Sequence, residues 1–218
     1  NPDEQTDREV YRLILVRRRA AEILLERDGP GWRLPRLEVE SGQRFAEQLT
    51  EGTREKWRLD TYCLFIPTFV PALEHLLRNS YVVLESTRQN DGALASMNWI
   101  PSTAAIREDA LPEDDCVAVR SALEEIERYV TEPASGPFGR PGWMQELFEW
   151  VQDVVGALGF RPTGRFQQFS ASPTFSLLRI ETSGMAVWFK ATGEPNVREL
   201  PVTVALARLF PRHVPELL

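Results

Sequence analysis

Residues 32–59 read WRLPRLEVESGQRFAEQLTEGTREKWRL, and this stretch decides the fold of the first half of the chain. Its second part carries Phe45, Leu49, Thr53 and Trp57 at a spacing of four residues. Side chains that recur at this spacing lie on one face of an α-helix. The sequence therefore predicts a helix over residues 44–58 whose buried face these four side chains form.

The same stretch resembles the box region of Nudix hydrolases. In that family a Leu-Pro-Gly-Gly turn leads into the pattern G-x5-E-x7-R-E-U-x-E-E-x-G-U. When Leu34-Pro35 is set on the family's Leu-Pro, every later position follows without a gap. The first box Gly is then Leu37, the first Glu is Gln43, the Arg-Glu pair is Glu51-Gly52, the Glu-Glu pair is Glu55-Lys56, the closing Gly is Arg58, and the final apolar residue is Leu59.

The resemblance implies a fold without the family's chemistry. A Nudix enzyme holds Mg²⁺ or Mn²⁺ against a diphosphate, and hard divalent cations need several anionic oxygens. Of the box carboxylates only Glu55 is kept, and Lys56 places a positive charge beside it. We therefore expect a Nudix-like fold that does not hydrolyse diphosphates.

Residues 1–132 are predicted to form this Nudix-like domain, an αβα sandwich. Strands are expected over residues 10–16, 23–25, 62–70 and 81–84, and residues 97–101 resemble the Trp-containing segment after the central strands of Nudix proteins. A helix is expected over residues 113–130, and its first-turn acids suit the positive N-terminal end of a helix. These acids are Glu113, Asp114 and Asp115, and the predicted buried stripe of the helix is Val119, Leu123, Ile126 and Val130.

Residues 133–142 are rich in Pro and Gly and are predicted to be a linker. After it, a helix is expected to start at Trp143 and to end before Gly159. Three β-like runs follow at residues 165–170, 175–181 and 185–192, and then a helix over residues 201–210. The apolar face of the first of these helices comprises Trp143, Leu147, Trp150, Val151, Val154 and Leu158.

This second part, residues 143–218, resembles the start of the N-lobe of aminoglycoside-phosphotransferase-like kinases. The resemblance lies in VWFKA at residues 187–191 and in the segment that follows it. It implies that Lys190 holds ATP phosphates and that Glu199 orients Lys190. The family's glycine-rich loop is replaced here by a stretch in which Ser170 and Ser172 are the candidate phosphate contacts. The catalytic and Mg²⁺-binding Asp residues would lie in a C-terminal lobe, so we expect this chain alone to transfer no phosphate.

Composition excludes several other classes. A net charge of −7 argues against binding to nucleic-acid phosphates. No apolar run is long enough to span a membrane. The two cysteines, Cys63 and Cys116, lie in apolar contexts and form no disulfide framework, so we expect core positions and a cytoplasmic location. His75 and His213 lie in no zinc-type cluster.

Three functions follow for this α/β (α+β) chain. The first is the N-terminal portion of a bacterial, ATP- and Mg²⁺-dependent small-molecule kinase. Its partners would be the missing C-terminal lobe and an unknown acceptor, and the fragment itself would need no cofactor. The second is a divergent Nudix hydrolase of nucleoside diphosphate derivatives that gathers carboxylates from Glu38, Glu40, Glu47, Glu51 and Glu55, with Glu51 and Glu55 sharing a metal ion. The third is a non-catalytic interaction module built around the helix that starts at Trp143.

Overall fold

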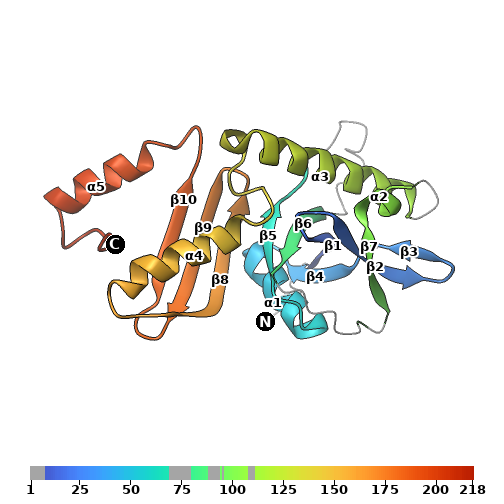
Figure 1. Cartoon of the computed structure of the whole chain (residues 1–218), viewed down its shortest axis with the longest axis horizontal. Coiled ribbons are helices and arrows are strands. Elements are labelled where there is room, and N and C mark those ends of the chain that lie inside the picture. The colour runs from blue at the N-terminus through green and yellow to red at the C-terminus, as the bar shows by residue number, and fades with distance from the viewer. Residues whose placement is uncertain (1–7, 69–79, 88–93, 95, 108–110) are drawn as a thin grey trace, which may run out of the picture.

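The computed structural model of the chain describes residues 8–68, 80–87, 94, 96–107 and 111–218 (Figure 1). The protein is a mixed α/β structure with one seven-stranded sheet and one three-stranded sheet. No helix in the described part of the chain is long and apolar enough to cross a lipid bilayer.

The larger sheet is organised around a long first strand. Its strands are β1 (Arg8–Arg17), β2 (Glu22–Asp28), β3 (Gly31–Arg33), β4 (Arg36–Glu40), β5 (Thr61–Phe65), β6 (Ser80–Ser86) and β7 (Met97–Pro101). The order is β3-β2-β1-β6-β5, with β4 beside β1 and β7 beside β2. The β1–β6 pair is parallel, and the other pairs are antiparallel. Strand β5 therefore lies at the end of this order.

Helices cover both faces of this sheet, as the sequence predicts for an αβα sandwich. Successive side chains of a strand point to opposite faces, so Leu13 and Leu15 of β1 pack in the cluster that contains α1 (Phe45–Trp57). Ile14 and Val16 pack in the cluster that contains α3 (Glu113–Thr131). A short helix, α2 (Ser102–Ala105), follows β7.

Three details of the first half differ from the sequence prediction. Strand β5 ends at Phe65, and Ile66 is 46% exposed, while residues 69 and 70 of the predicted strand lie outside the described part of the chain. Val130 is 55% exposed, and Tyr129 takes the buried place in that turn of α3. Asp115, predicted only as a first-turn acid of this helix, is fully buried. The predicted burial of Cys63 and Cys116 is confirmed.

The second sheet is an antiparallel meander covered on one face by a helix. It follows α4 (Trp143–Gly156) and comprises β8 (Pro162–Ser172), β9 (Phe175–Thr182) and β10 (Val187–Thr192), in the order β10-β9-β8, after which comes α5 (Glu199–Leu209). The predicted elements are present, but the predicted face of α4 is partly wrong. Trp150 and Leu158 are about half exposed, and the buried side chains are Trp143, Met144, Leu147, Val151 and Val155.

Residues 133–142, predicted as a linker, pack against the end of α3. They begin with a 3-10 turn at Pro133–Ser135. A Cβ atom on Gly136 would lie 2.3 Å from the ring of Tyr129, and one on Gly139 would lie 2.7 Å from it. Glycine is required at both positions because the backbone passes directly over the ring. The division into a domain of residues 1–132 and a part of residues 143–218 stays a prediction.

One side chain joins the two sheets. Gln168 of β8 is fully buried, and its amide faces the backbone of Cys63 on β5. The Cys63 N–H donates to Gln168 Oε1 at 2.8 Å, and Gln168 Nε2 donates to the Cys63 carbonyl at 2.9 Å. Gln168 thus supplies both hydrogen bonds that a neighbouring strand would make at this position.

Apolar contacts extend the same junction. Trp143 packs edge-on against Tyr62 with ring centroids 6.0 Å apart. A single cluster of buried side chains runs from Ile14 of β1 to Ile180 of β9. Figure 1 shows the small sheet and α4 placed beside α1 and β5 of the large sheet. The two halves therefore share one continuous hydrophobic core.

We predict that Gln168→Ala lowers the free energy of unfolding by about 3 kcal/mol, because it leaves the N–H and C=O of Cys63 buried without partners. The matched control is Gln167→Ala, whose part-buried side chain contacts Glu47 at 3.4 Å and should cost less than about 1 kcal/mol. Urea denaturation of the three proteins measures both values. Equal losses for the two variants would contradict the bridging role of Gln168.

Candidate functional site

In the box region, a large residue and a small residue stand at positions where the resemblance expects the reverse. Leu37 of β4 stands where the resemblance places a Gly, and Gly52 of α1 stands where it places a Glu. A Cβ atom on Gly52 would lie 3.0 Å from Leu37 Cδ1. The leucine side chain therefore lies against the helix surface from which a metal-binding carboxylate would project.

The ammonium group of Lys56 lies next to this contact. Lys56 Nζ donates to the carbonyl of Arg36 at 3.1 Å and lies 4.9 Å from the centroid of the Trp57 ring. Glu51 and Glu55 are exposed on α1. The described residues contain no group of three or more His, Cys, Asp or Glu side chains that could hold a metal ion.

The other carboxylates of the hydrolase alternative are dispersed. Glu38 pairs with Arg8 at 3.4 Å. Glu40 accepts a hydrogen bond from Gln43. Glu47 accepts one from Gln167 at 3.4 Å. The structure does not bring these groups together with Glu51 and Glu55 into one site.

The end of α1 is left-handed at Arg58, the position that the resemblance aligns with the closing Gly of the box. Arg58 caps the helix with φ 58° and ψ 28°, the left-handed conformation. Its N–H donates to the Arg54 carbonyl at 3.0 Å, and the next N–H, that of Leu59, donates to the Thr53 carbonyl at 3.3 Å. Glycine is the usual residue at such a helix end because it has no Cβ penalty. The conformation therefore agrees with the alignment of Arg58 on the closing Gly of the box.

The second candidate site lies on the small sheet. Lys190 of β10 forms an ion pair with Glu199, the first residue of α5. Their side chains are 50% and 37% exposed. Pro201 lies two residues further on, within the first turn, where its missing N–H has no intrahelical role. The two residues that the kinase resemblance singled out are thus in direct contact.

The serine candidates lie in a strand rather than in a loop. Ser170 and Ser172 belong to β8, and the hairpin turn is only Pro173-Thr174. Ser170 and Lys190 both pair with Leu177 of β9, so all three share one row across the sheet. Ser170 and Lys190 are two strands apart, about 10 Å. The Ser170 hydroxyl is buried with no hydrogen-bond partner among the described residues, while Ser172 Oγ donates to the Phe175 carbonyl at 3.4 Å.

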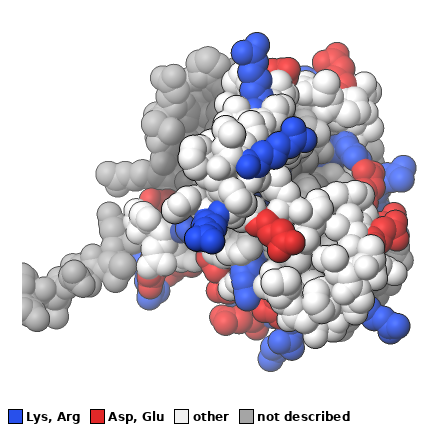
Figure 2. All heavy atoms as spheres, turned by 90° about the vertical axis from the view of Figure 1, so that its left-hand side faces the viewer, with Lys and Arg blue, Asp and Glu red and all other residues white. Residues whose placement is uncertain are grey.

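Helix α5 carries an uncovered apolar surface. None of its residues is buried. Figure 2 faces this end of the molecule, where charged side chains are sparse over a broad area. The exposed apolar side chains of α5 and the residues around it include Val197, Leu200, Val202, Leu206, Leu209 and Phe210.

Sequence reasoning missed three buried carboxylates. Asp115 of α3 pairs with Arg12 and accepts a hydrogen bond from Tyr81 at 2.9 Å. Glu125 of α3 accepts bonds from both the N–H and the hydroxyl of Thr68. The third is Glu85 of β6. A charged residue within an apolar strand, as Arg12 is in β1, was the available signal for the first of these.

Glu85 links the two halves and lines a cleft between them. Its carboxylate accepts hydrogen bonds from the Tyr62 hydroxyl and from the Gly142 N–H, the latter at 2.7 Å. Burial raises the pKa of Glu85 above its ordinary value, although both hydrogen bonds act against this rise. The cleft has a volume of about 1280 Å³.

No family model matches the chain, and no curated protein matches it. Among solved structures it is similar to MutT studied from Aliivibrio salmonicida and Vibrio cholerae, with 15% identity over 54% of this chain and 98% of that chain and a TM-score of 0.38. It is also similar to a putative oxidoreductase from Sinorhizobium meliloti (16% identity, 58% of this chain and 40% of that chain, TM-score 0.38). A third is the MutT protein of Bacillus halodurans (15% identity, 54% and 82%, TM-score 0.38). From similarity at this level we draw nothing about the activity of the chain.

We predict that Arg58→Gly raises the free energy of unfolding by about 1 kcal/mol, because glycine adopts the left-handed conformation without the Cβ clash. Thermal and urea unfolding of the variant measure the change. Arg58→Ala is the control and should stay within about 0.5 kcal/mol of the parent, since alanine keeps the Cβ atom. A destabilised Arg58→Gly variant would contradict the assigned helix end.

Proposed function

We propose that the chain is the N-terminal portion of a bacterial, ATP-dependent small-molecule kinase of the aminoglycoside-phosphotransferase-like type, with a Nudix-like half that does not hydrolyse. The observation that carries the proposal is the Lys190–Glu199 ion pair on the last strand of the small sheet. An exposed ion pair contributes little to stability, so the pair is better explained by what it positions than by what it stabilises.

The chemistry of this site suits a polyphosphate. A lysine ammonium is a compact charge on a flexible stem, and a carboxylate that holds it fixes the point at which a phosphate oxygen can bind. Ser170 lies in the same row, but its hydroxyl is buried, so the proposal assigns the phosphate contact to Lys190. The proposal has ATP bind here through its α- and β-phosphates, held by Lys190 and oriented through Glu199.

The Mg²⁺ that accompanies ATP has no ligand set among the described residues. Its ligands, the catalytic base and the acceptor site would belong to a C-terminal lobe, as the resemblance implies. Without that lobe the chain would position neither the acceptor nor the metal. The proposed role of the Nudix-like half is to bind, regulate or support this kinase.

The second candidate function is a divergent Nudix hydrolase. Glu51 and Glu55 favour it, because they are exposed and one helical turn apart. The Leu37–Gly52 contact and the ammonium of Lys56 favour the non-hydrolytic role instead.

We expect no cleavage above background when the protein is incubated with Mg²⁺ and a panel of nucleoside diphosphate derivatives. Release of nucleoside monophosphate, followed by chromatography, is the measurement. Cleavage at enzyme-like rates that is lost in Glu55→Gln would establish the hydrolase and overturn the non-hydrolytic role of the box.

We predict that Lys190→Ala raises the Kd of the full-length protein for MgATP at least tenfold, because it removes a charge-assisted contact to the phosphates. The chain contains only two lysines, Lys56 and Lys190. Lys56→Ala is therefore the matched control and should leave the Kd unchanged. Calorimetric titration measures all three proteins, and unchanged affinity in Lys190→Ala would remove Lys190 from the site.

A further inference from the structure

The cleft between the two halves has walls from both. From the first half come the turn between β1 and β2, the end of α1 and the end of β6. From the second half come the start of α4 and the side chains of Met144, Phe148 and Phe166. Its volume of about 1280 Å³ exceeds that of most small-molecule sites. The cleft lies apart from both Lys190 and the exposed carboxylates of α1, none of which lines it.

Five arginines line this cleft, and four of them form ion pairs with carboxylates of the protein. Arg54 pairs with Asp60 at 3.0 Å. Arg140 pairs with Glu146. Arg17 and Arg18 both pair with Glu22. Arg19 alone among these arginines forms no hydrogen bond or ion pair with any described residue.

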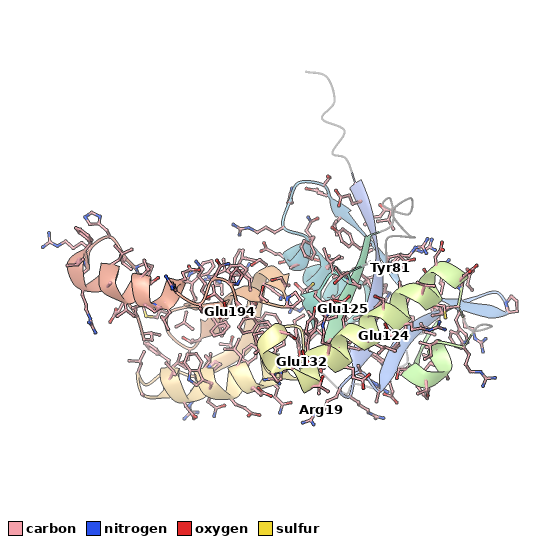
Figure 3. The ribbon with its side chains drawn as sticks, turned by 90° about the horizontal axis from the view of Figure 1, so that it is seen from above. Arg19, Tyr81, Glu124, Glu125, Glu132 and Glu194 are labelled. Carbon is pink, nitrogen blue, oxygen red and sulfur yellow. The ribbon has the colours of Figure 1, made fainter. Side chains whose placement is uncertain are left out.

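Arg19 nevertheless lies close to the acidic groups of the cleft. Figure 3 places it at the edge where the two halves meet. Burial raises the pKa of Glu85, and the charge of Arg19 acts in the opposite direction. The hydrogen bond from Arg140 lowers the pKa of Glu146, and the charge of Arg19 contributes to that decrease. Arg19 is exposed and lines the cleft, and its guanidinium donates to no described residue.

The turn that presents Arg19 is strained. Arg18, Arg19 and Ala20 have φ values of 53°, 58° and 65°, and none of them is glycine. A left-handed conformation costs about 1–2 kcal/mol for each such residue. Strain of this kind in a turn beside a cleft is a common property of binding sites, where it fixes a side chain before the ligand arrives.

We propose that this cleft binds a small phosphorylated, hydroxyl-bearing molecule, whose phosphate monoester is held by Arg19. A guanidinium binds a phosphate through two parallel hydrogen bonds, and Arg18 beside it adds charge. The carboxylates Asp60, Glu85, Glu146 and Glu149 line the same cleft, so a ligand that carried only anionic groups would be repelled.

Glu149 is the reason why we expect the ligand to carry hydroxyl groups. Its side chain is exposed and accepts a hydrogen bond only from Gln145, at 3.0 Å, among the described residues. It can therefore accept a further bond from a sugar hydroxyl. Phe148, Phe166 and Met144 offer apolar surface for the ring of the sugar or base. Nucleoside monophosphates and sugar phosphates share these features.

The test is a calorimetric titration of the full chain with AMP and with glucose 6-phosphate, each compared with adenosine and glucose. A Lys190→Ala background removes any contribution of the proposed ATP site. We expect saturable binding of at least one phosphorylated compound and none of its unphosphorylated partner. Whichever compound binds identifies the source of the phosphate.

Substitutions of Arg19 test whether the ligand binds in this cleft. Arg19→Ala should weaken binding at least tenfold, and Arg19→Lys should give an intermediate affinity because it keeps the charge without the fork of donors. Arg208→Ala, an exposed arginine of α5, is the control and should bind as the parent does. Absence of saturable binding, or binding that is unchanged in Arg19→Ala, would overturn the proposal. Since the titration uses the Lys190→Ala protein, either outcome leaves the kinase proposal to its own test.

Discussion

The amide of Gln168 is the interaction on which the arrangement of the two halves depends. It makes both hydrogen bonds that Cys63 would otherwise lack at the edge of the large sheet, and it does so in a fully buried position. Buried backbone groups without partners cost about 1–3 kcal/mol each. A displaced small sheet would expose those groups, so the bridge fixes where β8 lies against β5. The edge-on packing of Trp143 against Tyr62 and the Gly142–Glu85 bond follow from that placement.

The spacing of apolar residues predicted the helices and strands well, because it indicates which residues face the core. The helix over residues 44–58, the helix over residues 113–130 and the three strands of the small sheet are all present. This spacing could not predict which distant parts of the chain pack against a given side chain. Trp150 has the spacing of the buried face of α4 but is 54% exposed, because only one side of its ring packs, edge-on, against Phe189 of β10 at 6.2 Å. Asp115 looks like an ordinary first-turn acid until Arg12 and Tyr81, distant in sequence, come together beneath it. The role of Gln168 left no pattern in the sequence.

The box region shows how strand β4 and helix α1 pack without the carboxylates that the resemblance would place there. Leu37 packs against Gly52, so β4 and α1 are in close contact at the position where the resemblance places a metal-binding carboxylate. Arg58 keeps a left-handed helix end at a cost that glycine would avoid. Under the proposed function, a box region without these acidic groups would support a neighbouring site. That neighbour would be the row formed by Ser170, Leu177 and Lys190 on the small sheet.

The central claim is that Lys190 holds nucleotide phosphates. The most direct test is to treat the full-length protein with an acyl-phosphate derivative of ATP, which acylates a lysine amine held against the phosphates, and to map the modified peptides by mass spectrometry. Lys56 and Lys190 are the only lysines of this chain, so a lysine-modified peptide from this chain identifies one of the two as its target. The account predicts acylation of Lys190, suppressed by excess ATP, and little at Lys56. Acylation of Lys190 no greater than that of Lys56, or unaffected by ATP, would contradict it.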